Sequence, residues 1–271
     1  TCRLMRISRL RQFLAALVAS TCALGAQASI NITLQFDGSL SPAEQAYFTT
    51  AETYWESVLT GYQPGISVAS IVIDARKVAN DGPGGVLASA GPVGATFQGG
   101  FWLTTSGVMH FDTADIGSMI AGGSFSTVIQ HEMAHVLGFG TLWNVASGPQ
   151  LYTNGSGQFT GANAVAAFRT EFNQPGASFV PVELGGGVGT ADAHWNENSG
   201  TSPVGLVDGQ GRDMQFELMT GWINTPAFVS QTTLATPARA AWPRCAAPSM
   251  RTNRRSRPSP SGSRPVPTAI G

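Results

Sequence analysis

The hydrophobic pattern changes period twice along the first part of the chain. Apolar and polar side chains alternate over residues 30–36 and again over residues 66–74, which is the pattern of half-buried strands. Between these strands, residues 41–44 (Ser-Pro-Ala-Glu) form a capping box with proline in the first helical position. A helix is therefore predicted from there to Gly61, and its apolar stripe consists of Tyr47, Phe48, Ala51, Tyr54, Trp55, Val58 and Leu59.

The following segment is rich in glycine and predicts short strands. We expect residues 101–104 and 108–111 to pair across a turn at residues 105–107. The loop at residues 81–85 (Asp-Gly-Pro-Gly-Gly) lacks the lysine and the following helix of a phosphate-binding loop. Phosphate binding is therefore not expected there.

A second helix is predicted over residues 126–137, and Gly138 stands where this helix would end. Its apolar residues occur on all sides, so we expect it to be buried: Val128, Ile129, Met133, Val136 and Leu137. The order of elements predicts an α+β fold in which two long helices cover a mixed, twisted sheet. Beyond Gly138 the pattern is interrupted by glycine-rich turns, and only residues 162–172 predict another helix.

The buried helix carries the H-E-x-x-H pattern as His131, Glu132 and His135. Histidines four residues apart lie on the same face of an α-helix, about 6 Å apart along its axis, so both can bind one metal ion. Glu132 points to the side of that pair, where a carboxylate can accept the proton of a zinc-activated water as the water attacks a carbonyl. The alternative is a core helix with two hydrogen-bonded histidines and a chance glutamate.

A catalytic zinc site needs a third protein ligand and leaves one position open. The compact metzincin spacing would place this ligand at position 141, which is Thr141, and the chain has only two other histidines, His110 and His194. His110 lies in a predicted strand, where it could face solvent as easily as the metal. His194 is the remaining downstream histidine, and the rival is a carboxylate ligand from Glu171, Glu183, Glu197 or Glu217.

At this point the sequence resembles the leishmanolysin-like metallopeptidases, a metzincin family whose third histidine follows an insertion. The matching segments are residues 131–143, 193–197 and 217–221, and residues 106–115 also look like the family. The likeness covers about residues 30–235. It indicates a secreted member of the bacterial type with a metzincin-like fold and an irregular C-terminal subdomain.

The resemblance implies zinc ligation by His131, His135 and His194, with Glu132 as general base and Met219 in the Met-turn beneath the metal. It implies a secreted zinc endopeptidase acting on an extended peptide or protein substrate. In metzincins an edge strand binds such a substrate through main-chain hydrogen bonds, and the resemblance places that strand within residues 86–112. Trp143 and Trp195 could wall the site, but packing in the core is the simpler expectation.

Composition narrows the possible partners. The formal net charge is −1, only 11% of residues are charged, and there are 33 glycines. Such a chain is typical of a loop-rich secreted protein and gives no reason to expect a nucleic acid or an anionic membrane as partner. We expect a monomer. Beyond Ala28 the only cysteine is Cys245, which excludes an intrachain disulfide in a cleaved chain and a cysteine-rich zinc site.

The two ends of the sequence differ from its middle. Residues 1–28 predict a secretory signal peptide, with extra residues before Met5 and cleavage after Ala28. An uncleaved anchor is the alternative, but the apolar stretch is short for a membrane span. Residues 236–271 hold seven prolines, seven arginines and no acidic residue, so we expect a disordered tail, from a reading-frame change or as a true basic extension.

The predicted organisation is thus a signal peptide at 1–28, an N-terminal zincin subdomain at 29–138, a C-terminal subdomain at 139–235 and the tail at 236–271. We expect the mature protein outside the cell or in the periplasm. The alternative function is a non-catalytic secreted binding or matrix module, or an inactive relative that keeps the fold. Cleavage assays with and without Glu132 would separate these two functions.

Overall fold

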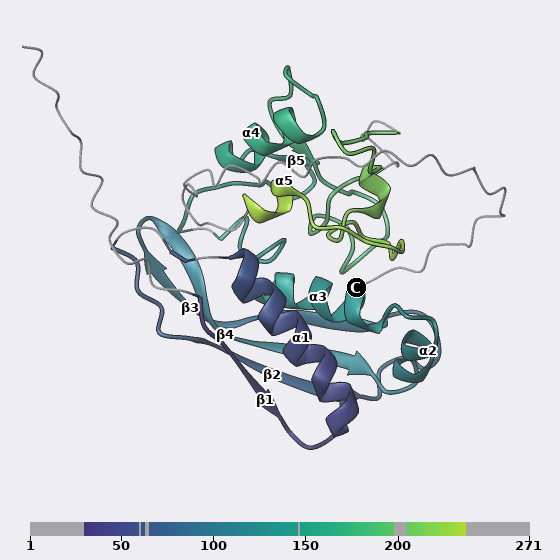
Figure 1. Ribbon diagram of the computed structural model, residues 1–271. Helices are drawn as coiled ribbons and strands as arrows, with labels where there is room; N and C mark the ends of the chain where they lie inside the picture. Colours follow the sequence, from purple (N-terminus) through teal and green to yellow (C-terminus); the bar gives the residue numbers. More distant parts are fainter. Residues whose placement is uncertain (1–29, 60, 63–64, 146, 198–204, 237–271) are drawn as a thin grey trace, which may run out of the picture.

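The computed structural model describes residues 30–59, 61–62, 65–145, 147–197 and 205–236. The predicted signal peptide, Cys245 and all of the predicted tail except Thr236 lie outside these residues. The polypeptide forms a four-stranded sheet, a layer of helices on one face of that sheet, and a loop-rich segment on the far side of the helices (Figure 1). The fold is α+β and metzincin-like, as predicted.

The four-stranded sheet has the order β1-β2-β4-β3. Strands β1, β2 and β4 are parallel, whereas β3 is antiparallel to β4 and occupies one edge. The register pairs Ile32 with Ile71 and Val72 with Ser106. The strands are β1 (Ile32–Phe36), β2 (Ile71–Val78), β3 (Ala88–Gln98) and β4 (Phe101–Asp112).

Helix α1 (Pro42–Val58) begins at the predicted capping box. The Ser41 hydroxyl accepts a hydrogen bond from the Glu44 amide at 3.3 Å, and the Glu44 carboxylate accepts one from the Ser41 amide at 2.6 Å. Phe48 from the predicted apolar stripe is fully buried and packs edge-on against Phe111 of β4. The aromatic stripe is therefore core, as expected.

Two strand predictions were wrong. The second strand spans residues 71–78 rather than 66–74, because the chain stays extended beyond Asp74, with Asp74 and Arg76 on the partly exposed face of the strand. Residues 101–104 and 108–111 belong to the single strand β4. Gly107, which suggested a turn, lies instead where α3 approaches the sheet, since a Cβ there would be 2.5 Å from the Val136 side chain.

The edge strand β3 also escaped prediction as one element. Its centre contains Gly91, Pro92 and Gly94, which break the alternating pattern, and the register with β4 shifts at that point. The turn of this hairpin lies at Gly99 and Gly100. The glycines in the sequence therefore suggested breaks in this segment, whereas pairing with β4 makes it one continuous strand.

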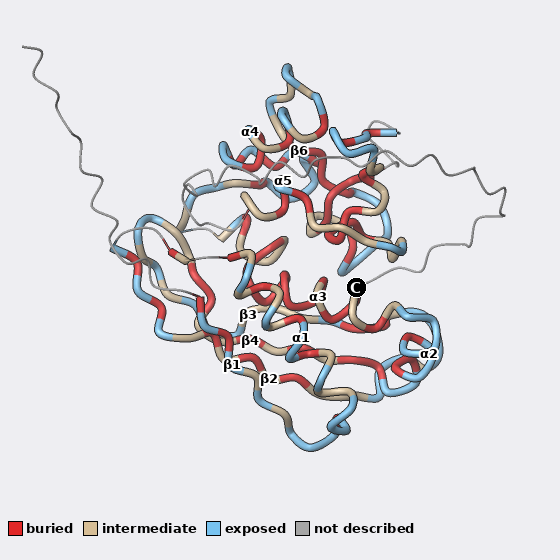
Figure 2. The backbone as a smooth tube through the Cα atoms, in the orientation of Figure 1, coloured by how far each residue is buried: buried red, intermediate tan, exposed pale blue. Residues whose placement is uncertain are grey.

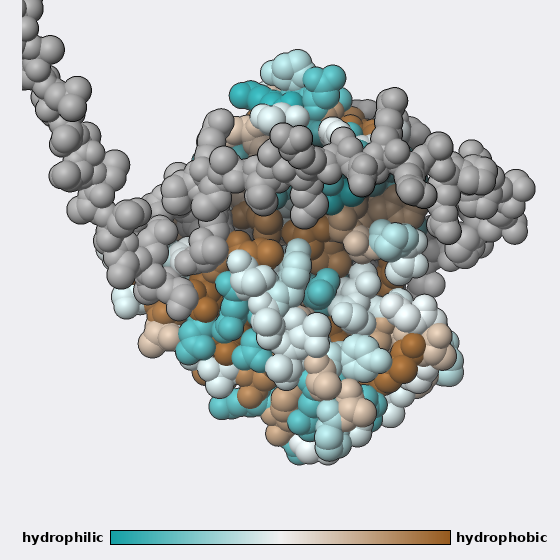
Figure 3. Space-filling view, in the orientation of Figure 1, coloured by the Kyte–Doolittle hydropathy of each residue, from teal (hydrophilic) through white to brown (hydrophobic). Residues whose placement is uncertain are grey.

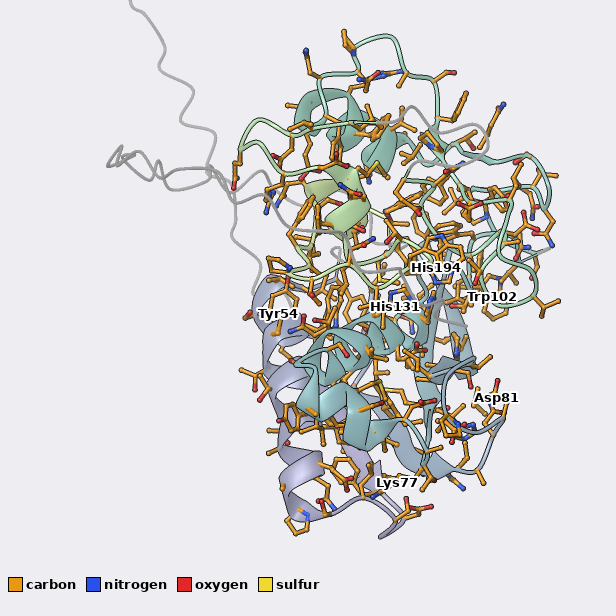
Figure 4. All side chains as sticks on the ribbon, turned by 90° about the vertical axis from the view of Figure 1, so that its right-hand side faces the viewer. Tyr54, Lys77, Asp81, Trp102, His131 and His194 are labelled. Carbon is orange, nitrogen blue, oxygen red and sulfur yellow. The ribbon has the colours of Figure 1, made fainter. Side chains whose placement is uncertain are left out.

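Helix α3 (Phe125–Val136) lies between the sheet and the loop-rich segment (Figures 1 and 4). It is buried over nearly its full length, as predicted from its apolar residues (Figure 2). The predicted helix at 162–172 is α4 (Ala162–Glu171). Elements that the pattern did not predict are α2 (Ile116–Ala121), the small sheet of β5 (Gln158–Phe159) and β6 (Val180–Pro181), a 3-10 turn at Met214–Phe216, and α5 (Gln231–Leu234).

One hydrophobic core connects the two halves of the described chain. Its second part is an aromatic cluster in which Trp143 and Trp195 stack with ring centroids 5.1 Å apart, between Phe139 and Phe159. Hydrophobic residues also appear in a band between the two halves on the face in Figure 3. Both tryptophans are buried and therefore serve packing. Within the described residues, no helix combines the length and the apolar composition that crossing a membrane requires.

Candidate metal centre

Three histidines meet in the interior, between α3 and the loop-rich segment (Figure 4). His131 and His135 lie one turn apart on α3, and His194 comes from an irregular segment far along the chain. The Nε2 atoms of His131 and His194 are 2.9 Å apart, and each of the other two Nε2 pairs is separated by 3.0 Å. The structure therefore brings together the three histidines that the sequence analysis predicted as metal ligands.

Each imidazole is oriented by a main-chain carbonyl on its other side. The Nδ1 atoms of His131, His135 and His194 lie 2.7, 2.9 and 2.9 Å from the carbonyl oxygens of Leu218, Phe139 and Thr190, in that order. A carbonyl oxygen only accepts hydrogen bonds, so we infer that each Nδ1 carries the proton. All three Nε2 atoms of the neutral rings then present bare lone pairs to one another.

Burial keeps these rings neutral. Removal from water lowers the pKa of His135 to about 4 and, together with the nearby His135, the pKa of His194 to about 3. The same desolvation, with repulsion from the other two histidines, holds the pKa of His131 well below its usual value. Three lone pairs facing each other at 3.0 Å repel, and a cation at their centre removes this repulsion.

The donor set fits a zinc ion. Zinc accepts imidazole nitrogen at about 2.0–2.1 Å in tetrahedral sites, which places the ligand nitrogens roughly 3.3–3.4 Å apart. The observed separations of 2.9–3.0 Å are only a few tenths of an ångström shorter. Second-side hydrogen bonds from each Nδ1 are also the usual arrangement of metal-binding histidines. Among the described residues, no other His, Cys, Asp or Glu joins this cluster.

Glu132 is fully buried next to His131, and neither of its carboxylate oxygens has a hydrogen-bond partner among the described residues. Desolvation raises the pKa of this carboxyl group well above its usual value. An ionised carboxylate is stable in such a place only if a cation or a hydrogen-bond donor, such as water, lies beside it. The side chain is thus available to exchange a proton at this site.

His194 reaches the other two histidines because its segment is fixed on both sides. The Glu183 amide donates to the carbonyl of His194 at 2.9 Å, and the Trp195 amide donates to the carbonyl of Met219 at 2.9 Å. Trp195 also donates through its indole nitrogen to Thr233 at 2.9 Å. The histidine is therefore held by the same segment that contains the predicted Met-turn.

Gly140 permits the close approach of this segment to the end of α3. Its φ is +71°, and a Cβ at this position would overlap the carbonyl oxygen of Ala193, the residue before His194. We expect Gly140→Ala to displace His194 and to weaken zinc binding about tenfold or more, the loss typical when a ligand is poorly oriented. Isothermal titration of the metal-free protein with zinc measures this change.

Gly155→Ala is the matched control. Gly155 has a similar φ of +75°, but no atom lies within 4 Å of its would-be Cβ. This variant should lose only the roughly 1–2 kcal/mol of stability that a left-handed backbone costs an L-residue, with unchanged zinc affinity. Equal zinc affinities for the two variants would show that the approach of Gly140 to Ala193 does not position the third histidine.

Glu217 was one of the candidate carboxylate ligands, but in the structure its carboxylate hydrogen-bonds to the protein away from the histidine cluster. Its carboxylate accepts hydrogen bonds from the Met219 amide at 2.6 Å, the Ser230 amide at 2.9 Å and the Thr233 hydroxyl at 2.7 Å. It thereby fixes the turn whose Leu218 carbonyl orients His131. Met219 is fully buried in that turn. The sequence analysis did not predict that Glu217 fixes this turn. A glutamate followed directly by Leu218 and Met219 could have indicated a buried, hydrogen-bonded carboxylate.

The remaining candidates lie outside the cluster. His110 is on β4 opposite Arg76 of β2 and belongs to no metal-binding group. Glu171 accepts hydrogen bonds from the start of α5, and Glu183 and Glu197 are buried elsewhere in the loop-rich segment. Thr141, at the position of the compact third ligand, donates instead to the carbonyl of His135 at 2.7 Å. A carboxylate as third ligand therefore has no support from the geometry.

The low pKa values predict how the metal-free site responds to acid. In the unfolded chain a histidine gains its proton below about pH 6.5. Folded His135 and His194 gain theirs near pH 4 and pH 3, so their contribution to stability falls as pH drops below 6.5. Glu197 acts in the opposite direction, because burial raises its pKa to about 7 and the folded state binds its proton first.

These opposing contributions make global unfolding a poor test, whereas NMR follows each imidazole separately. We expect the ring protons of His135 and His194 in the metal-free protein to keep the chemical shifts of neutral imidazole at pH 6. A midpoint between pH 6 and 7 for either ring would contradict the burial and hydrogen bonding described above. The variants His135→Gln and His194→Gln assign the resonances.

Comparison with known proteins identified a matching family. A family model described as leishmanolysin, a peptidase family, matches residues 61–236. This match includes the whole of α3, all three clustered histidines and the turn around Met219. No curated protein matches the chain at the threshold of significance.

Proposed function

Because the chain belongs to the leishmanolysin family of metallopeptidases, we propose that it is a secreted zinc endopeptidase with a mononuclear active site. The proposed ligands are His131, His135 and His194, and the proposed general base is Glu132. One observation carries this assignment. Three neutral imidazoles present bare nitrogens to a common centre, beside a buried carboxylate that has no hydrogen-bond partner in the described part of the chain.

A zinc ion, when bound, polarises a carbonyl oxygen and lowers the pKa of a water molecule to about 7. The role of Glu132 follows from its position and burial. An Oε atom of its carboxylate accepts the proton of the attacking water, and the resulting carboxylic acid donates that proton to the leaving amine. The raised pKa favours the first transfer, because burial makes the Glu132 carboxylate a stronger base than an exposed glutamate.

The proposed substrate is an extended peptide beside β3. This strand ends the sheet, so one row of its main-chain groups pairs with no other strand among the described residues. β3 also packs against α3, which carries two of the histidines. A peptide that pairs with the edge strand would therefore be held alongside the histidine cluster by main-chain hydrogen bonds. The predicted range 86–112 contains this strand.

Metal removal and reconstitution test the proposal. The full chain is treated with a strong chelator, dialysed, and assayed for casein cleavage with and without one equivalent of zinc. The proposal requires loss of cleavage on chelation and its return with zinc. Cleavage that continues without any metal would refute it. Stoichiometric zinc binding with no cleavage of casein or of a mixed peptide library would instead favour a non-catalytic binding module.

Export is the part of the proposal that depends on sequence alone. Residues 1–28 have the basic, apolar and Ala-x-Ala order of a signal peptide, and they lie outside the described residues. N-terminal sequencing of the exported protein should begin at Ser29. Recovery of the full-length chain in the cytoplasm or in the membrane would contradict this part of the proposal without affecting the metal centre.

A further inference from the structure

A buried methyl group connects the predicted Met-turn with the third histidine of the cluster. This methyl group belongs to Thr190, which is 2% exposed and lies four residues before His194. The main-chain carbonyl of Thr190 is 2.9 Å from the Nδ1 atom of His194, and this contact orients the imidazole. The direction of the His194 ring therefore depends on where the main chain of Thr190 lies.

Two glycines approach the methyl group of Thr190. A Cβ added at Gly221 would lie 2.3 Å from the Cγ2 atom of Thr190, and a Cβ added at Gly186 would lie 2.5 Å from the same atom. Carbon atoms in favourable contact are about 3.5–4.0 Å apart, so neither glycine can carry a side chain while Thr190 keeps its place. Threonine is also stiff at χ1, because its Cβ carries two heavy atoms, and this limits rotation of the methyl group.

Gly221 belongs to the segment that contains the predicted Met-turn. This segment runs beside the third histidine, since the Trp195 amide donates to the carbonyl of Met219 at 2.9 Å. The φ of Gly221 is not positive, so alanine suits the backbone there and only the neighbouring atoms oppose it. Gly186 differs, because its φ of +78° would strain an alanine whatever the space. A substitution at Gly221 therefore tests the contact with Thr190 alone.

We propose that Thr190 is a positioning residue for the third zinc ligand and that the contact of its methyl group with Gly221 holds it in place. The contact fixes the main chain around the Thr190 carbonyl, and that carbonyl holds the His194 ring with Nε2 directed at the other two histidines. Thr190 and Gly221 act only through His194. The inference rests on the proposed zinc site and adds how the Met-turn segment controls its third ligand.

Zinc titration of the metal-free full chain by calorimetry tests the contact. Gly221→Ala displaces Thr190, so we expect zinc to bind at least about tenfold more weakly, the loss typical when a partner that orients a metal-binding histidine is disturbed. Thr190→Ser removes the methyl group, keeps the hydroxyl and makes room for the alanine. The double variant Gly221→Ala/Thr190→Ser should therefore bind zinc about fivefold more tightly than Gly221→Ala, or better, as residues in contact are coupled.

Gly176→Ala serves as the control. Its φ is not positive either, and no atom of the described residues lies within 4 Å of its would-be Cβ, so zinc affinity should be unchanged. A second readout needs no zinc. In the metal-free wild type, the Nδ1 proton of His194 is hydrogen-bonded to the Thr190 carbonyl, so its NMR signal should be protected from exchange with water. We expect Gly221→Ala to lose this signal and the double variant to recover it.

The outcomes separate a positioning role from simple packing. A lower unfolding temperature of Gly221→Ala, with unchanged zinc affinity and an unchanged Nδ1 signal, would mean that the contact only fills the core, and this would overturn the proposal. So would equal zinc affinities of Gly221→Ala and the double variant. If Gly221→Ala does not fold, the double variant must fold and bind zinc, and its failure to do so counts against the proposal. If the wild type binds no zinc, the proposed function fails, whereas the Nδ1 signal still decides whether Thr190 orients His194.

Discussion

Glu132→Gln is expected to reduce peptide-bond hydrolysis by about 10²–10⁴-fold, the contribution that a positioned general base makes. Glutamine has the shape of the protonated glutamate but cannot accept a proton. The wild-type carboxyl is buried with its pKa raised, so the neutral replacement adds no desolvation cost. Casein cleavage and zinc content, measured on the same preparation, should show lost turnover with one zinc per chain.

The control for this variant is Glu52, a partly exposed glutamate on the other long helix. Glu52→Gln makes the same chemical change on α1 and should retain wild-type cleavage. If Glu132→Gln retained wild-type turnover, Glu132 would not be the general base. If the variant lost zinc along with activity, its role would be to hold the centre together rather than to transfer the proton.

His194→Ala is expected to remove both zinc and activity from a protein that still folds. Outer-sphere partners of metal-binding histidines contribute about 10–100-fold in affinity, so deletion of a ligand should cost more than about 100-fold. His194 is fully buried, and its Nε2 lies within 3.0 Å of both other Nε2 atoms. Zinc titration monitored by calorimetry and casein cleavage measure the two losses.

His110→Ala provides the matched comparison, because His110 is the one histidine that the structure places outside the cluster. This variant should bind zinc and cleave casein as the wild type does. Equal zinc affinity for His194→Ala and His110→Ala would mean that the third ligand comes from elsewhere. A carboxylate would then have to be reconsidered, and Glu183 is adjacent through the hydrogen bond between its amide and His194.

The sequence predicts the helix-borne half of the site well, because that half depends on local geometry. The spacing of His131 and His135 on a buried helix is sufficient to place two imidazoles on one face. The capping box at Ser41 and the end of α3 near Gly138 are local features too, and both occur as predicted. Each of these predictions needed only residues within one or two helical turns.

The other half depends on long-range contacts, and the pattern could not provide it. Nothing in the separation between His135 and His194 predicts that they meet. His194 was favoured because it is the remaining downstream histidine and because the family resemblance implied it. The carbonyl groups of Leu218, Phe139 and Thr190 orient the three rings, but every residue has a carbonyl. Their roles follow from the fold of the main chain and not from residue type.

The strands of the sheet were also difficult to predict from local sequence. Gly107 looks like a turn residue in sequence, whereas in the structure it makes room for the Val136 side chain of α3. The glycines and the proline in the centre of β3 look like a loop, yet pairing with β4 keeps them in a strand. Tertiary packing overrides local preference at these positions.

X-ray absorption at the zinc edge of the zinc-loaded protein tests the central claim most directly, because it counts and identifies the atoms around the metal. The account predicts three imidazole nitrogens at about 2.0–2.1 Å and a further oxygen from a non-protein ligand. Two imidazoles, a sulfur ligand or a fourth protein nitrogen would contradict an open centre built from His131, His135 and His194.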